Sequence, residues 1–138
     1  MFSWRINQSL SKAKVFEDGS YHKVPDEMWN KRYNVKKGDL IVTLYNHGQP
    51  LYVTEIHGTS FRDILQSLYN GLNDTIDNND SEIIQEIINN FIKYDTRKKL
   101  TDKLIRGTLK VKDLLGDHVF YEGNLTRHHG IWTYALGS

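Results

Sequence analysis

The fold is decided by a stretch that reads DLIVTLYNHGQPLYVTEIH, residues 39–57. It contains two runs rich in Val, Ile, Leu, Thr and Tyr, which are typical strand residues, on either side of the polar segment 46–50. This pattern predicts that residues 39–45 and 51–57 form an antiparallel hairpin. Neither alternating face of residues 51–57 is cleanly polar, so we expect the second strand to be covered on both sides.

A hairpin and a short helix are predicted before this stretch. Residues 13–24 carry Asp18-Gly19 between two apolar runs. The Asp-Gly pair is a strong signal for a two-residue turn, because glycine readily takes a positive φ. Pro25 followed by two acidic residues predicts the start of a short helix near Trp29.

The pattern changes to a helical period after residue 57. Apolar residues recur at helical spacing over 61–72, and Ser60 with Asp63 resembles a capping box in which Asp replaces Glu or Gln. A second helix is predicted after an N-cap at Asp80 or Ser81. Its apolar stripe consists of Ile83, Ile84, Ile87, Ile88, Phe91 and Ile92.

A third, basic helix is predicted from an N-cap at Thr96 to a C-cap at Gly107. The chain then returns to a β pattern, with strands predicted at 109–111, 119–125 and 131–136. The last two are joined by residues 126–130, TRHHG.

These elements predict an α+β fold, in which an antiparallel sheet built from hairpins carries two to three helices packed on one face. The 138 residues suit one domain spanning residues 1–138, with a polar, mobile linker near residues 73–80.

The composition is that of an ordinary globular protein, with 38% hydrophobic and 25% charged residues. The lack of cysteine excludes disulfides, thiolate nucleophiles and zinc sites built on sulfur. No apolar run approaches the roughly 20 residues that span a bilayer, so no transmembrane segment is predicted. We expect a cytoplasmic, intracellular protein that can also be associated with a virus particle.

A basic cluster is the strongest functional signal. The net charge is only +1, so an electrostatic function requires local clustering, and residues 97–112 hold seven basic residues against one acidic residue. If Leu100 and Leu104 face the core, five basic side chains point outward: Arg97, Lys98, Lys99, Lys103 and Arg106. Such a surface suits the phosphates of a nucleic acid or an anionic membrane. The alternative is that it balances the acidic residues of 74–86 within or between subunits.

Histidines carry the alternative, enzymatic hypothesis. The adjacent His128 and His129 can supply an acid, a base, a metal ligand or a phosphate contact near neutral pH. Together with His118 they are candidate acid and base groups of a metal-independent ribonuclease. The structural alternative is a solvated turn with incidental histidines. No nucleotide, phosphate-loop or metalloprotease motif is present, and no cofactor or metal is predicted.

The sequence therefore predicts a non-enzymatic binding and assembly module. A compact β-rich domain with a basic helix and self-contact is typical of small viral or phage structural or accessory proteins of a matrix-like kind. We expect a homo-oligomer or a protein partner. The second helix can leave Ile84 or Phe91 for a partner, although burial in the core is the use that we favour for its apolar residues. Phe2 and Trp4 can anchor on another subunit, on a lipid interface or on their own sheet.

Overall fold

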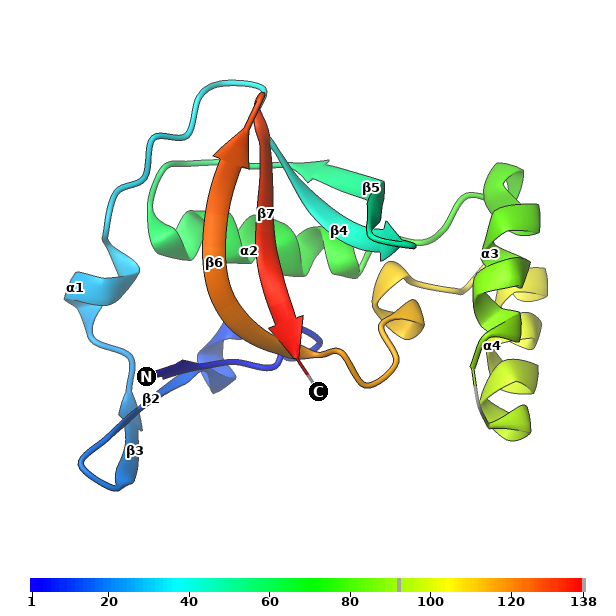
Figure 1. Cartoon of the computed structure of the whole chain (residues 1–138), viewed down its shortest axis with the longest axis horizontal. Coiled ribbons are helices and arrows are strands. Elements are labelled where there is room, and N and C mark those ends of the chain that lie inside the picture. Colours follow the sequence, from blue (N-terminus) through cyan, green and yellow to red (C-terminus); the bar gives the residue numbers. More distant parts are fainter. Residues whose placement is uncertain (92, 138) are drawn as a thin grey trace.

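The centre of the fold is a four-stranded sheet with the strand order β5-β4-β7-β6. The computed structural model describes residues 1–91 and 93–137, and Figure 1 shows their arrangement. The strands of this main sheet are β4 (Leu40–Asn46), β5 (Gln49–Glu55), β6 (Phe120–His128) and β7 (Ile131–Gly137). The predicted hairpins β4–β5 and β6–β7 are confirmed, and both are antiparallel. They join through a parallel pairing of β4 with β7. The sheet is therefore mixed, whereas the sequence predicted an antiparallel sheet.

The two hairpins close through turns that are tighter than predicted. His47 and Gly48 connect β4 to β5 with φ of 52° and 77°, and His129 and Gly130 connect β6 to β7 with φ of 51° and 78°. Positive φ at both central positions is the signature of a type I′ turn, whose twist matches that of the strands. Residues 126–128, predicted to lie in the connection, therefore continue β6.

Helix α2 (Phe61–Leu72) packs against β4 and β5. The predicted capping box is confirmed, because Ser60 Oγ accepts from the Asp63 N–H at 3.1 Å and Asp63 Oδ2 accepts from the Ser60 N–H at 3.2 Å. Gly71 marks a close approach of helix and sheet. A Cβ at this position would lie 2.6 Å from Thr54 Cγ2, so alanine does not fit without a shift of the helix.

The N-terminal residues form a second, three-stranded sheet with the order β1-β2-β3. It consists of β1 (Phe2–Ser3), β2 (Lys14–Glu17) and β3 (Ser20–Lys23), with the 3₁₀ helix η1 (Leu10–Lys12) between the first two. The hairpin predicted around Asp18-Gly19 is confirmed, as is the short helix that follows it, α1 (Asp26–Trp29).

The first aromatic residues pack inside their own chain. Trp4 is only 2% exposed, and its indole N–H donates to the carbonyl of Gln8 at 2.9 Å. The Phe2 ring meets Phe61 and Tyr121 edge-on at centroid distances of 5.2 and 5.7 Å. Of the three predicted uses of Phe2 and Trp4, the structure shows packing on their own core.

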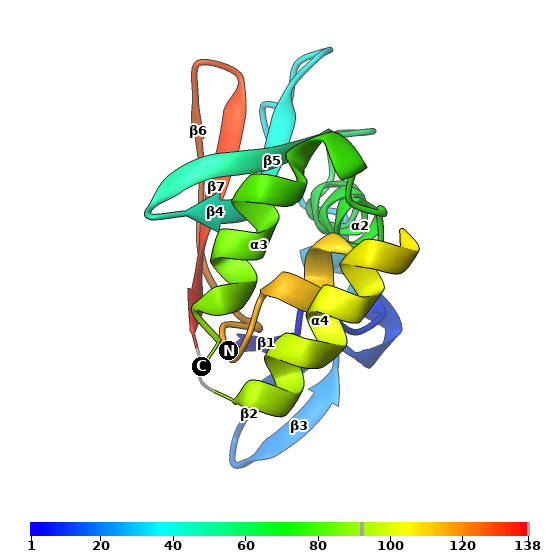
Figure 2. The ribbon, with the colours of Figure 1, turned by 90° about the vertical axis from the view of Figure 1, so that its right-hand side faces the viewer.

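Helices α3 (Ser81–Asn89) and α4 (Tyr94–Arg106) form a helical hairpin at one end of the molecule (Figures 1 and 2). The C-cap at Gly107 is confirmed, with a left-handed φ of 71°. The N-cap is Lys93, so α4 begins before the predicted cap Thr96. Ile84 is fully buried and thus not left for a partner, whereas Phe91 is half-buried. Ile92 of the predicted stripe lies outside the described residues.

The segments that flank the helical hairpin are anchored to each other. Ile76, in the predicted polar linker, is 5% exposed, and its N–H donates to the Leu109 carbonyl at 2.8 Å. The linker ends in the 3₁₀ helix η2 (Asn78–Asp80). Residues 109–111 do not form the predicted strand, because Val111 begins the 3₁₀ helix η3 (Val111–Leu114). The mobility of the linker stays a prediction.

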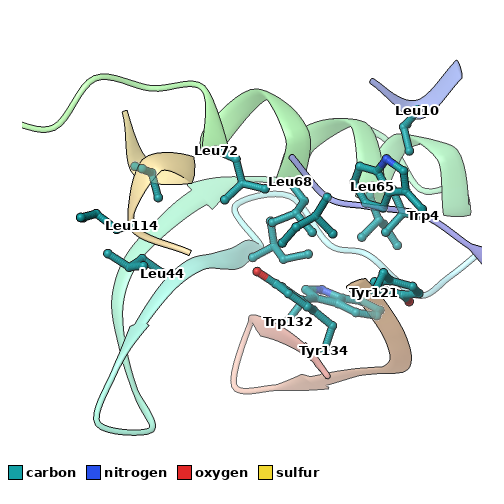
Figure 3. Close-up of a cluster of buried hydrophobic side chains, with 14 of the residues drawn as sticks. Trp4, Leu10, Leu44, Leu65, Leu68, Leu72, Leu114, Tyr121, Trp132 and Tyr134 are labelled. Carbon is teal, nitrogen blue, oxygen red and sulfur yellow. The ribbon is translucent and has the colours of Figure 1, made fainter. Parts of the chain in front are cut away.

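The buried side chains of both sheets and of α2, α3 and α4 form one hydrophobic cluster, part of which is drawn in Figure 3. The α+β class predicted from the sequence is confirmed. Within the described residues, none of the helices has the length and apolar character needed to cross a membrane.

Candidate functional site

The basic helix α4 turns one apolar side toward the core and another side toward α3. Leu100 and Leu104 are buried, at 6% and 7% exposure. The side that faces α3 is marked by Thr101, whose hydroxyl accepts a hydrogen bond from Gln85 Nε2 at 3.2 Å. At 3.6 residues per turn, these two reference points fix the direction of every other side chain on the helix.

The five predicted basic residues consequently point in different directions. Arg97 is half-buried on the core side, contrary to the prediction that all five lie outward. Lys98 is exposed and lies closer to the α3 side. Lys99, Lys103 and Arg106 are exposed and follow the spacing i, i+4, i+7, which places them along one side of the helix, away from Thr101. We call these last three residues the basic stripe.

Among the described residues, the basic stripe forms one ion pair with an acidic side chain. Lys103 Nζ lies 3.4 Å from Asp113 Oδ1 on η3, and the Lys103 side chain is 47% exposed. Lys99 and Arg106 have no ion-pair partner within 4 Å in the described part of the chain. Within α4 itself, five basic and two acidic residues, Asp95 and Asp102, leave a net charge of +3.

The acidic helix α3 lies beside α4, which is the arrangement required for charge balance within one chain (Figure 2). Its exposed acidic residues are Glu82 and Glu86. Over residues 1–91 and 93–137, neither carboxylate comes within 4 Å of a basic group. The contact between α3 and α4 is therefore made by apolar residues and by the Gln85–Thr101 hydrogen bond.

The candidate histidines do not converge into one site. His128 ends β6 and His129 occupies the adjacent turn, where the two exposed rings meet at a centroid distance of 4.1 Å. His118 precedes β6, at the opposite end of that strand. The strand β6 runs from Phe120 to His128, which corresponds to about 25 Å at about 3.3 Å per residue before its two register shifts are considered. The predicted acid and base groups thus include one close pair and one distant residue.

An ionic cluster around the buried Asp39, beneath this turn, was not predicted. Asp39 is 3% exposed, and its Oδ2 accepts from Arg127 Nε at 2.7 Å and from the Trp132 indole N–H at 2.9 Å. A second guanidinium nitrogen of Arg127 donates to Asp39 Oδ1 at 3.0 Å, and the Lys36 N–H donates to Oδ2 at 3.0 Å.

This cluster ties the β6–β7 hairpin to the start of β4. The hydrogen bonds from Arg127 hold the pKa of Asp39 far below its ordinary value, outweighing the burial that raises it. A carboxylate that accepts four hydrogen bonds and is 3% exposed is a structural anchor, because its burial keeps it from solvent. The only sequence signal for it is an acidic residue placed directly before an apolar strand.

Comparison with known proteins adds no further assignment, since no family model, curated protein or solved structure matches this chain. Across the part of the chain that the structure describes, no three His, Asp or Glu side chains are grouped in a way that can hold a metal ion. The basic stripe is therefore the candidate site that the geometry supports best.

Proposed function

We propose that this protein is a non-enzymatic binding module that contacts the phosphates of a nucleic acid through Lys99, Lys103 and Arg106. The observation that carries the proposal is the alignment of these three exposed cations along one side of α4. This helix lies at one end of the molecule (Figure 1). Two of them have no ion-pair partner among the described residues, so a phosphate would replace water and not a protein carboxylate.

A nucleic acid fits this surface better than an anionic membrane does. A helix that lies in a membrane interface needs a continuous apolar side for the lipid, whereas Leu100 and Leu104 are already buried in the core. The exposed apolar residues of α4 are Tyr94 and Ile105, at 71% and 78% exposure. They are eleven residues apart, or about 16 Å along the helix, with Lys98 and Thr101 in the same row.

The expected affinity is modest and strongly dependent on salt. Three phosphate contacts to a single strand correspond to a slope of about −2 in log K against log salt concentration. Raising the salt from 50 to 200 mM should then weaken binding about 20-fold. The acidic residues Asp95 and Asp102 lie close to the stripe and oppose any larger electrostatic effect.

The test is a binding titration of labelled single-stranded RNA, duplex DNA and anionic vesicles over a salt series. The variant Lys99→Gln/Lys103→Gln/Arg106→Gln should lose RNA or DNA binding. A matched control, Lys14→Gln/Lys23→Gln/Lys37→Gln, removes the same charge from exposed positions elsewhere and should retain it. Equal loss in both variants would contradict a specific surface. Binding to vesicles alone would replace the nucleic acid by a lipid surface.

The ribonuclease hypothesis is tested in the same experiment. We expect the RNA to remain intact, because His118 lies at the far end of β6 from His128 and His129. RNA cleavage that disappears in the variant His128→Ala/His129→Ala would overturn the non-enzymatic assignment.

Self-association is a second part of the proposal, and the exposed Ile105 favours it. This side chain is 78% exposed beside an open groove between α3 and α4, which Leu104 also lines. A homo-oligomer should increase in mass with concentration, and Ile105→Lys should abolish the increase. A mass that stays monomeric at all concentrations would contradict self-association.

The expected cytoplasmic, viral or phage setting stays a prediction.

A further inference from the structure

The parallel strands β4 and β7 separate soon after they pair. Their register contains only the pairs Leu40–Ile131 and Ile41–Trp132, although β4 continues to Asn46 and β7 to Gly137. In the same stretch, β4 is irregular between Val42 and Tyr45, where it pairs with β5. Figure 1 shows the two strands diverging toward their carboxyl ends.

A cavity of about 370 Å³ opens between the separated strands. Helix η3 forms its third wall, and the lining residues are Thr43, Leu44, Tyr45, Leu114, Leu115, His118, Tyr134 and Leu136. Figure 3 shows Leu44 and Leu114 at one end of the buried cluster, on the side where this cavity lies. The volume falls within the range of about 300–1,000 Å³ that is typical of small-molecule sites.

The chemistry of the lining selects the class of ligand. The lining contains four leucines and two tyrosines but no Asp, Glu, Lys or Arg, so an ionised ligand gains no counter-charge there. The Tyr134 hydroxyl donates to the carbonyl of Val42, whose strand is irregular at that point. The Tyr45 ring meets the Tyr134 ring at a centroid distance of 6.2 Å and is half-buried. Burial raises the pKa of the Tyr45 phenol, and a hydrogen bond from the backbone of Tyr134 opposes part of this rise. A neutral Tyr45 hydroxyl donates to an acceptor at neutral pH.

We propose that the cavity between β4, β7 and η3 binds a small, uncharged aromatic molecule whose polar substituent accepts a hydrogen bond from Tyr45. The leucines enclose the ring, and the exposed His118 lies at the opening. The site uses none of the three residues of the basic stripe. It therefore goes beyond the proposed function, and a failure of either assignment leaves the other unaffected.

The test uses 4-methylphenol as the probe and p-xylene, which has the same shape without a hydroxyl, as its comparison. We expect both to cause saturable NMR shifts of the Leu44, Leu114 and Leu136 methyl groups. The dissociation constant of 4-methylphenol should be about 1 mM or lower, as is typical of a ligand of this size in a formed pocket. Tyr45→Phe should weaken 4-methylphenol about fivefold, the value of one net hydrogen bond, and leave p-xylene unchanged.

Filling variants provide the decisive control. Leu136→Trp and Leu115→Trp, made separately, should each abolish the shifts of both probes, whereas Val53→Trp on the exposed part of β5 should not. Tyr45→Phe adds no bulk, so it keeps the test valid if a filling variant fails to fold. Absence of saturable shifts, or shifts that persist when the cavity is filled, would overturn the proposal. An equal loss of both probes in Tyr45→Phe would overturn the role of the hydroxyl.

Discussion

Two ion pairs at different places in the molecule show what burial does to the same chemistry. Asp39 and Arg127 meet at 2.7 Å, and only the carboxylate is buried: the side chains of Asp39 and Arg127 are 4% and 31% exposed. Lys103 and Asp113 meet at 3.4 Å, with side chains that are 47% and 18% exposed. The carboxylate of the first pair also accepts a hydrogen bond from the Trp132 indole. In the second pair, Lys103 is a member of the basic stripe.

The difference in burial distinguishes a charge that stabilises the fold from charges that are exposed to solvent. A buried carboxylate that loses its partners keeps the full cost of desolvation, so the packing around it depends on the pair. An exposed pair exchanges its partner for water at little cost. The charge of Asp39 therefore serves the fold, whereas the charges of Lys99, Lys103 and Arg106 are exposed to solvent.

The largest effect is expected from Asp39→Asn. The amide keeps one acceptor oxygen but directs an NH₂ group at donors such as the buried Trp132 indole N–H or the Arg127 guanidinium, so we expect a loss of about 3 kcal/mol in the free energy of unfolding. Urea unfolding measures it. The matched control Asp102→Asn, at an exposed position on α4, should stay within about 0.5 kcal/mol of the original protein. Equal effects of the two changes would remove the distinction between the regions.

A smaller loss, about 2 kcal/mol, is expected from Gly71→Ala in the packed layer. The added Cβ would lie 2.6 Å from Thr54 Cγ2 and 2.8 Å from Thr43 Cγ2, which forces α2 away from the sheet. The neighbouring Asn70→Ala, on the exposed side of the same helix, should be neutral or slightly stabilising. An unchanged free energy of unfolding in Gly71→Ala would show that α2 packs less tightly on β4 and β5 than these contacts indicate.

Acid should weaken the Asp39 cluster in a predictable direction. Because the folded-state pKa of Asp39 is depressed, its contribution to stability is complete above the ordinary value of 3.8 and is lost as the pH falls below it toward the folded-state value. Unfolding curves measured from neutral pH to about pH 3 should show this loss, which stays partial over that range. Asp39→Asn should flatten the acid limb without removing it, since hydrogen bonds from Ser60 and Thr59 outweigh burial and lower the pKa of Asp63 as well. An unchanged acid limb in Asp39→Asn would contradict the assignment.

The smallest effect belongs to the exposed pair. A double-mutant cycle of Lys103→Gln with Asp113→Asn should give a coupling of about 0.5 kcal/mol that disappears in high salt. Over the same salt range, the difference in stability between Asp39→Asn and the original protein should hardly change. A coupling at Lys103 as large as the effect of Asp39→Asn would mean that the basic stripe is held by the fold and is less available to a ligand.

The sequence alone determined the features that depend on neighbouring residues. The hairpin around Asp18-Gly19, the Ser60–Asp63 capping box and the C-cap at Gly107 each follow from residues within a few positions of one another. The apolar period of α2 likewise indicated its buried side. In α3, Ile84 and Ile88 of the predicted stripe are buried, whereas Ile83 is 41% exposed. Such features are local, so a short window of sequence contains the physical cause of each one.

Only the tertiary structure decided how distant segments meet. Asp39 and Arg127 are 88 positions apart, and no local pattern connects them. The parallel pairing of β4 with β7 opened the cavity, and the length of β6 separated His118 from His128. The side of α4 that packs against α3 decided which three of five basic residues share one surface. These outcomes depend on the packing of whole elements, because burial and pairing of remote side chains are properties of the assembled core.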